Sequence, residues 1–244
     1  MSRIICGLQP VREAIRTHGA ELARVIVLDA RDREASPQLD ALARFAADHG
    51  APVERVPRSE LDRAAKGVRH QGAIAFAPEL RVRSLDEIDL GPDTLVVALD
   101  EVQDPQNFGA VVRSAVAMRA TAILWPEHRS APLSPSMFRA SAGAIEHAAL
   151  VRVTSLPHAL TTLRERGVFV VGLDANGTDV IDRVDLKRPA AIVVGAEGKG
   201  LRRTVKTACD ALTRLPMPGP IDALNASVAV AIALYECVRQ RGTE

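Results

Sequence analysis

Hydrophobic positions along the first 76 residues alternate between the spacings that are typical of strands and of helices. Short apolar or β-branched runs predict strands at Arg24–Asp29, Val53–Val56 and Ala73–Phe76. Apolar residues three or four positions apart predict a helix over Gln38–His49, and Ser59–Ala65 predicts a short helix that begins at a capping residue. The pattern indicates a small α/β unit.

Residues 77–92 interrupt this pattern. They contain Pro78 and Pro92 and carry mixed charge, which predicts a linker between a first domain over residues 1–76 and a second over 93–244. The second domain opens with a near-continuous apolar run, Thr94–Leu99, which is typical of a parallel strand buried on both faces.

The rest of the second domain again alternates strands and helices. Strands are predicted at Ala122–Trp125, Val168–Leu173 and Ile192–Val194, and helices at Asn107–Met118, Ser134–Ser141 and Leu156–Arg166. Residues 225–240 predict a final helix whose broad apolar face carries Val228, Ala231, Ile232, Tyr235 and Val238. This alternation predicts a mostly parallel α/β sheet.

Charge and composition exclude some classes of protein. The 31 basic and 30 acidic residues nearly cancel, which argues against a purely electrostatic, non-specific nucleic-acid binder but allows a local basic patch. Arginine far outnumbers lysine, and this bias reflects either phosphate binding or a GC-rich genome.

Three cysteines, Cys6, Cys209 and Cys237, are odd in number and widely spaced, so we expect free thiols rather than a disulfide framework or a zinc site. The N-terminal residues lack the pattern of a signal peptide, and no run of about 18 apolar residues predicts a membrane span. We therefore expect a cytoplasmic protein without a membrane partner.

The first segment with candidate chemistry is Leu99–Ala115, where a buried strand ends in an acidic, proline-containing turn before a helix with Asn107 at its N-cap. Ligands of open parallel sheets bind outside the carboxyl ends of the strands, so Asn107 and Arg113 are candidate site residues. The alternative is that Asn107 only caps the helix and that Arg113 is merely solvated.

The second segment, Ile192–Val205, has the order strand, glycine-rich loop, helix. Gly195, Gly198 and Gly200 fit neither the dinucleotide fingerprint nor a Walker loop, so neither a kinase nor a classical dinucleotide enzyme is indicated. The glycines would let the backbone approach a ligand closely, with Glu197 beside it. A tight turn without a ligand is the alternative.

The third segment, Arg214–Glu236, is a strand end, a proline- and glycine-containing loop and the start of the final helix near Asn225. Leu215, Met217 and Leu224 would form an apolar lining suited to a flat base such as adenine. Alone, the segment also fits a simple loop before a C-terminal helix.

Together and in this order, the three segments resemble the SpoU-type (TrmH-like) family of RNA ribose 2′-O-methyltransferases. The resemblance continues through HRSAPLSPSMFRASAGAIEH (His128–His147), and CGLQPVREAI (Cys6–Ile15) and HQGAIA (His70–Ala75) are similar to the family's RNA substrate-binding domain. Length and domain order are most similar to bacterial members that methylate a guanosine of 23S ribosomal RNA.

The resemblance implies a SPOUT methyltransferase domain, a parallel α/β sheet with a C-terminal trefoil knot, preceded by a small α/β RNA-binding domain. It implies S-adenosylmethionine as cofactor, no metal, an RNA partner and a homodimer. Asn107, Arg113 and Glu197 match the family's catalytic positions. The matches to its cofactor-binding positions are Gly195, Leu215, Met217, Leu224 and Asn225.

The family assigns the role of base to the arginine that matches Arg113. Because arginine stays protonated, we expect Arg113 chiefly to position the target phosphate and ribose, with Asn107 holding either the arginine or the ribose. Glu197 would orient Arg113 within one chain or across a dimer.

Two positions depart from the family pattern. Ala223-Leu224-Asn225 stands where the family usually has Ser-Leu-Asn, and Arg119 where it commonly has glycine. A lost hydroxyl in a polar site costs about 1–3 kcal/mol if its partner is left unpaired. Ala223 motivates one alternative to a 23S rRNA enzyme, an RNA-binding assembly factor with impaired catalysis. A tRNA 2′-O-methyltransferase of the same family is the other alternative.

Overall fold

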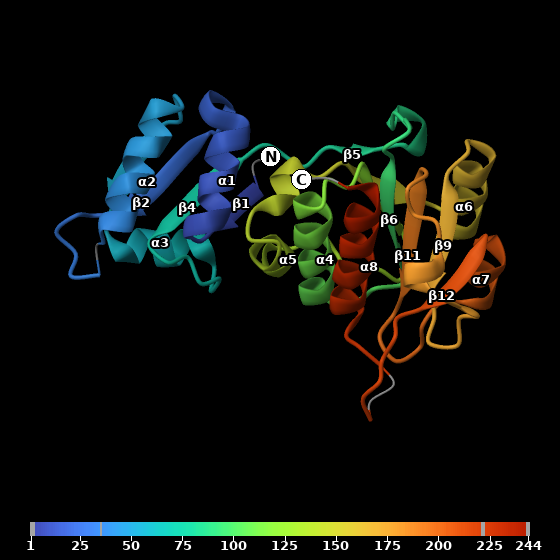
Figure 1. Cartoon of the computed structure of the whole chain (residues 1–244). Helices are drawn as coiled ribbons and strands as arrows, with labels where there is room; N and C mark the ends of the chain where they lie inside the picture. The colour runs from blue at the N-terminus through green and yellow to red at the C-terminus, as the bar shows by residue number, and fades with distance from the viewer. Residues whose placement is uncertain (1–2, 35, 221–222, 243–244) are drawn as a thin grey trace. The chain divides into compact units, whose positions relative to one another are not determined.

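The computed structural model describes residues 3–34, 36–220 and 223–242, and it divides into two compact units (Figure 1). The first contains Met1–Leu80 and Leu133–His147, and the second contains Arg81–Pro132 and Ala148–Glu244. These units differ from the domains expected from the sequence, because residues 133–147 belong to the first unit and residues 81–92 to the second.

The first unit is built on a four-stranded sheet in the order β1-β4-β2-β3, in which only β2 and β3 are parallel. Its strands are β1 (Arg3–Cys6), β2 (Arg24–Leu28), β3 (Val53–Val56) and β4 (Ala73–Ala77). Its helices are α1 (Leu8–His18), α2 (Pro37–Asp48), α3 (Arg58–Ala65), α5 (Pro135–Ala140) and the 3₁₀ turns η1 (Gly19–Glu21) and η3 (Ala144–His147). The sequence pattern predicted β2, α2, β3, α3 and β4, but neither β1 nor α1.

A buried ion cluster fastens residues 144–147 to this unit. Glu146, only 1% exposed, accepts a hydrogen bond from Arg3 Nη1 at Oε1, at 2.7 Å, and another from Arg3 Nη2 at Oε2, and His18 Nε2 lies 2.8 Å from the same Oε2. Arg3 also donates to the carbonyl oxygen of Pro78 at 2.7 Å. A carboxylate so deeply buried needs such partners, so the distant segment is tied to β1.

The second unit is built on eight parallel strands in the order β10-β12-β9-β11-β6-β7-β8-β5, which confirms the predicted parallel α/β fold. The strands are β5 (Val82–Arg83), β6 (Leu95–Asp100), β7 (Ala122–Pro126), β8 (Leu150–Val153), β9 (Phe169–Leu173), β10 (Asp179–Val180), β11 (Ala190–Gly195) and β12 (Ala211–Arg214). Its helices are α4 (Pro105–Ala117), α6 (Leu156–Glu165), α7 (Arg203–Ala208), α8 (Ala226–Arg241) and the 3₁₀ turns η2 (Leu85–Glu87) and η4 (Ile181–Arg183). Residues 77–92, which were predicted to be a linker, contain β5 and η2. Strand β5 pairs with β8, so part of this segment belongs to the sheet.

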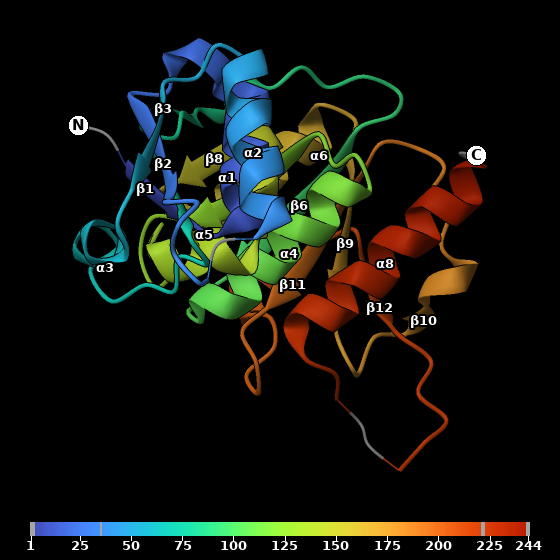
Figure 2. The same ribbon diagram turned by 90° about the vertical axis from the view of Figure 1, so that its left-hand side faces the viewer.

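Two layers of helices cover this sheet. Helices α4 and α8 lie side by side on one face, and α6 and α7 pack together on the other (Figures 1 and 2). Strand β6 is buried along its whole length and sends alternate side chains to each face, with Val96 and Ala98 joining Leu160 and Val205 under α6 and α7. No helix among the described residues combines the length and apolar character that crossing a membrane requires.

The broad apolar face predicted for the last helix is present but does not pack into the core. Val228, Ile232 and Tyr235 are 46%, 41% and 58% exposed. The buried side of α8 instead carries Ala226, Val230, Ala233, Leu234 and Cys237. An apolar face left open on a single chain indicates a surface that another molecule covers.

Arg119 lies just beyond the C-terminal end of α4 in a left-handed backbone conformation, with φ of +54°. Glycine adopts this conformation without a Cβ clash, so we expect Arg119→Gly to stabilise the fold by roughly 0.5–1 kcal/mol. Urea denaturation measures the change, and Arg119→Ala is the control because it removes the side chain but keeps Cβ. Equal stabilities for the two variants would contradict a backbone origin.

Candidate active site

The order of the strands creates a topological switch point between β6 and β11. The chain runs from β6 outward to β7 and β8, then continues on the other side of β6, where β11 pairs with it and Gly195 lies in register with Asp100. Both strands end at this register position, and the segments that leave them carry Asn107 and Glu197. Such a switch point at the carboxyl edge is where open α/β sheets bind ligands.

The loop after β6 leads into α4, and the helix begins earlier than predicted. Asp104, not Asn107, is the N-cap: its carboxylate accepts hydrogen bonds from the backbone N–H groups of Gln106 at 3.0 Å and Asn107 at 3.3 Å. Pro105 takes the first helical position, where its missing N–H costs nothing. Because Asp104 caps the helix, the Asn107 side chain is left for other contacts.

Three predicted site residues form a continuous chain of hydrogen bonds. Asn225 Nδ2 donates to Asn107 Oδ1 at 2.8 Å, and Asn107 Nδ2 donates to Glu197 Oε2 at 3.1 Å. The orientation of the Asn225 amide is set because its oxygen accepts from the backbone N–H and the hydroxyl of Ser227. The loops after β6 and β11 and the start of α8 thus converge on buried Asn107.

Arg113 is not part of this chain of hydrogen bonds. It lies six residues beyond Asn107 on α4, which places it roughly 120° around the helix. Its side chain is exposed and makes no hydrogen bond or ion pair within the described part of the chain. The structure of one chain therefore joins Glu197 to Asn107 but not to Arg113.

Close backbone packing shapes the loop after β11. A Cβ atom on Gly195 would lie 2.1 Å from the backbone of Gly200, so only glycine fits there. Ala196 and Gly200 form an isolated antiparallel bridge that closes the loop on itself. At Gly195 the close approach is therefore to the loop's own backbone, and the predicted approach to a ligand stays a prediction.

A buried ion pair holds the far end of the same loop. Asp100 is fully buried and accepts hydrogen bonds from Arg202 N at 2.8 Å and Arg202 Nε at 2.7 Å. The hydrogen bond to Asp100 raises the pKa of Arg202 above its usual value, against the opposing effect of burial. Sequence reasoning missed this pair, although an acidic residue at the end of a wholly apolar strand was a signal for it.

A cavity of about 230 Å³ opens beside this loop. Four of the five predicted cofactor-binding residues line it: Gly195, Leu215, Met217 and Leu224. Asn225 does not line it and instead contacts Asn107, while Glu197 and Ala223 both contribute to the wall. The apolar wall predicted from the third segment and the glycine loop of the second are therefore adjacent.

Two polar residues of this cavity were missed. Thr213 is fully buried in β12, and its hydroxyl oxygen has no hydrogen-bond partner among the described residues. Burial would raise the pKa of Asp174, but the hydrogen bond from Lys206, the Asn176 N–H and the charge of Lys206 together lower it. A buried hydroxyl without a partner indicates a place where a ligand atom completes the hydrogen bonding.

Comparison with family models covers both units. Residues 94–235 match the SpoU rRNA methylase family, and residues 4–82 match the domain described as RNA 2′-O ribose methyltransferase substrate binding. The two matches follow one another along the chain, as the sequence resemblance implied.

Individual proteins that are similar to this chain are also named as methyltransferases. An uncharacterized tRNA/rRNA methyltransferase of Mycobacterium ulcerans is 40% identical over 98% of this chain and 77% of its own length. The crystal structure of the SpoU methyltransferase AviRb from Streptomyces viridochromogenes in complex with the cofactor AdoMet superposes with a TM-score of 0.77 at 26% identity, over 98% of this chain and 90% of that one. The crystal structure of the AdoMet-bound rRNA methyltransferase from Sinorhizobium meliloti superposes with a TM-score of 0.79 at 25% identity. The superposition covers 99% of this chain and 88% of that one.

Proposed function

The chain belongs to the SpoU rRNA methylase family of RNA methyltransferases, and from that premise we propose that it transfers a methyl group from S-adenosylmethionine to a ribose 2′-hydroxyl of RNA, specifically of a guanosine in 23S rRNA. The observation that carries this proposal is the cavity beside the Gly195 loop, which adjoins the hydrogen-bonded chain Glu197–Asn107–Asn225. Ribosomal RNA is supported by the rRNA methylase match over residues 94–235 and by the named rRNA methyltransferase of similar structure.

The residues of the cavity fit S-adenosylmethionine. Leu215, Met217 and Leu224 offer an apolar surface for the adenine, and the Thr213 hydroxyl offers an unused donor and acceptor. When bound, this cofactor supplies an electrophilic methyl group. We assign Gly195 and the three apolar residues to cofactor binding, and we assign Asn225 to holding Asn107 at the edge of the cavity.

The Thr213 hydroxyl gives a specific test of this fit. We expect Thr213→Val to weaken S-adenosylmethionine binding about threefold to tenfold, the effect of one lost hydrogen bond, while leaving the stability of the free protein equal or slightly higher. Isothermal titration calorimetry measures the affinity, and Thr213→Ser is the control that keeps the hydroxyl. Equal affinities for all three proteins would place the cofactor elsewhere.

The reacting hydroxyl must lose a proton, which passes to solvent water, as its oxygen forms the new bond to carbon and the carbon–sulfur bond breaks. We propose that Asn107 orients the ribose and that Glu197 holds Asn107 and draws Arg113 toward the site. Arg113 remains protonated, so its role is to bind the phosphate and ribose of the target nucleotide and to stabilise charge that develops on the oxygen.

We also propose that the protein is a homodimer in which Arg113 completes the site of the partner subunit. The exposed face of α8 together with Ser114 of α4 forms a shallow, mainly apolar cavity of about 400 Å³. Arg113 lies next to Ser114 and has no partner of its own among the described residues. A second copy on this face would cover the apolar side chains and bring in a free arginine.

If this dimer forms, a charge placed on the exposed face of α8 should dissociate it. We expect Tyr235→Glu to shift the protein from dimer to monomer at micromolar concentration, because the carboxylate would be buried without a partner. Sedimentation velocity measures the shift, and Tyr235→Phe, which keeps the apolar face, should remain dimeric. A dimeric Tyr235→Glu protein would argue for a different interface.

The trefoil knot of the family is a further part of the proposal. Its support is the backbone of residues 195–201, which folds so tightly that Gly195 touches Gly200 and Leu201, and the position of β12 on the far side of β9 from β11. The fully buried Asp100 would hold the loop end through Arg202.

Transfer of a tritiated methyl group to unmodified 23S rRNA tests the function, with tRNA as the competing substrate. Incorporation into 23S rRNA at a guanosine ribose is the expected result. Transfer to tRNA alone would support the tRNA alternative, and cofactor binding without transfer to any RNA would support an assembly factor. Ala223 on the cavity wall favours that last candidate, and Ala223→Ser would then leave transfer absent.

A further inference from the structure

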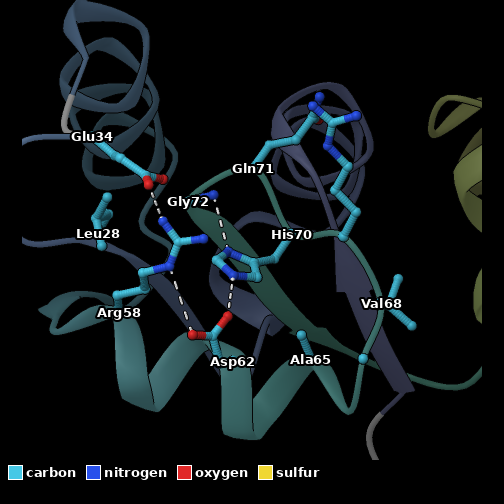
Figure 3. A pocket seen from close by; sticks show the side chains of 11 residues that line it. Leu28, Glu34, Arg58, Asp62, Ala65, Val68, His70, Gln71 and Gly72 are labelled. Carbon is cyan, nitrogen blue, oxygen red and sulfur yellow. Dashed lines mark hydrogen bonds and ion pairs between the residues drawn. The ribbon is translucent and has the colours of Figure 1, made fainter.

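A second cavity lies in the first unit and has no part in the proposed methyl transfer. It measures about 600 Å³, within the size range of ligand sites, and is enclosed by α3, the loop from Gly67 to Gly72 and the loop after β2 (Figure 3). Its lining includes charged groups of both signs: Glu34, Arg58, Asp62, Arg69 and His70.

The charged side chains of this cavity are held by one another. The Arg58 guanidinium lies between two carboxylates, pairing with Glu34 and lying 3.7 Å from Asp62 through its Nε (Figure 3). Asp62 Oδ1 is 3.0 Å from His70 Nε2, on the opposite side of the carboxylate. The network fixes the position of Asp62 at the cavity wall before any ligand arrives.

The backbone fixes the His70 ring. The Gly72 N–H donates to His70 Nδ1 at 3.0 Å, so in the neutral ring Nε2 carries the proton and donates to Asp62. Gly72 has φ of +80°, and a Cβ there would lie 2.7 Å from Leu39, so the position requires glycine. The imidazole, 11% exposed, is therefore held in one orientation within the lining.

The chemistry of the wall favours a nucleobase over a phosphate. Arg58 is already paired with the two carboxylates and is not free to bind a phosphate group, whereas each carboxylate oxygen has a lone pair left to accept an N–H. Arg69 makes no ion pair or hydrogen bond with other described residues, so its planar guanidinium can stack on a base or donate to it. Stacking on histidine or arginine is a common way in which proteins bind unpaired RNA bases.

Guanine matches this set of donors and acceptors. Its Watson–Crick edge carries two adjacent N–H donors, which pair with both oxygens of one carboxylate, and its N7 and O6 atoms accept from one arginine. Adenine, cytosine and uracil lack that pair of adjacent donors on separate nitrogens. A site that offers a carboxylate and a free arginine together therefore discriminates in favour of guanine.

We propose that the cavity formed by Asp62, Arg69 and His70 binds an unpaired guanine of the RNA substrate, separately from the nucleotide that is methylated. Asp62 accepts the N–H groups of the base, Arg69 donates to its acceptor atoms, and His70 holds the Asp62 carboxylate in place. This inference rests on the proposed function only in that the substrate is RNA.

Hairpin RNAs with one stem sequence and a single bulged G, A, C or U test the proposal. Fluorescence anisotropy with the full chain and no cofactor should show the G-bulge hairpin binding about tenfold more tightly than the others, the discrimination expected of one bidentate contact. Asp62→Asn should bring the four affinities within about twofold of each other. The control Asp48→Asn makes the same charge change on exposed α2 and should keep the preference.

Arg69→Ala separates recognition from folding, because Arg69 has no partner among the described residues whose loss could disturb the loop. It should also reduce the preference for the G bulge, with an unchanged melting temperature. Equal wild-type affinity for the four hairpins, or a guanine preference that Asp62→Asn and Arg69→Ala leave intact, would overturn the proposal. Tritium transfer to 23S rRNA is scored separately, so absence of methyl transfer with retained guanine preference would refute only the proposed function.

Discussion

Replacing Arg113 with alanine is expected to lower methyl transfer by about a hundredfold to a thousandfold, the effect of removing one donor that stabilises charge in a transition state. The affinity for S-adenosylmethionine should stay within about twofold, because Arg113 does not line the cofactor cavity and is exposed on α4. Tritium transfer and calorimetry on the same preparation measure the two quantities. A large loss of cofactor affinity would refute this division of roles.

Mixed dimers determine which subunit supplies the arginine. If Arg113 acts across the interface, a dimer of one Arg113→Ala chain and one Asn107→Ala chain retains one complete site, composed of intact Asn107 from the first and intact Arg113 from the second. A one-to-one mixture, after exchange of subunits, should then recover about a quarter of wild-type activity. Arginine acting within its own chain would give no recovery.

Replacing Glu146 with alanine is expected to destabilise the first unit by about 3–5 kcal/mol, because the buried guanidinium of Arg3 would lose its counter-charge. The only tryptophan, Trp125, lies in the second unit, so its fluorescence does not report this loss directly. Hydrogen exchange of the β1 and β4 amides, followed by mass spectrometry, measures the first unit by itself.

The matched control removes both charges. In Arg3→Met with Glu146→Leu, apolar side chains replace the pair, and most of the lost protection should return because no unpaired charge remains. If Glu146→Ala lowers the stability of the first unit by less than about 1 kcal/mol, the ion cluster is not needed for the packing of residues 133–147.

Local patterns predicted the elements that have a clear apolar run or spacing. Strand β6 was found from its unbroken apolar run, and helix α2 from apolar side chains three or four positions apart. Strand β1 and helix α1 were missed because only Gly7 separates them and Pro10 interrupts the helical pattern near the start of α1. Two elements joined by a single residue carry no turn pattern that would mark them apart.

Long-range contacts explain the other differences. The assignment of residues 133–147 to the first unit depends on a pair of residues 143 positions apart, Arg3 and Glu146, which no local window contains. The apolar face of α8 has the right spacing for core packing, yet small residues on its other side pack on the sheet. The spacing of apolar residues along α8 shows that the helix has an apolar face, but it does not show what that face packs against.

The candidate site was predictable in its residue types and not in its hydrogen bonds. Segment order brought Asn107 and Glu197 together at one sheet edge, as the parallel fold requires. The cap at Asp104 was missed because Asp and Asn are equally good capping residues three positions apart. The Thr213 hydroxyl was missed because β12 is a short strand whose burial depends on its neighbours.

The order of synthesis gives the Arg3–Glu146 pair another consequence. During synthesis β1 is made before α5 and η3, which complete the same unit and follow only after residues 81–132 of the second unit. The Arg3–Glu146 pair therefore forms only after residue 146 has been made, although domains generally fold in the order in which they are synthesised. Until then, the Arg3 guanidinium on β1 lacks its counter-charge.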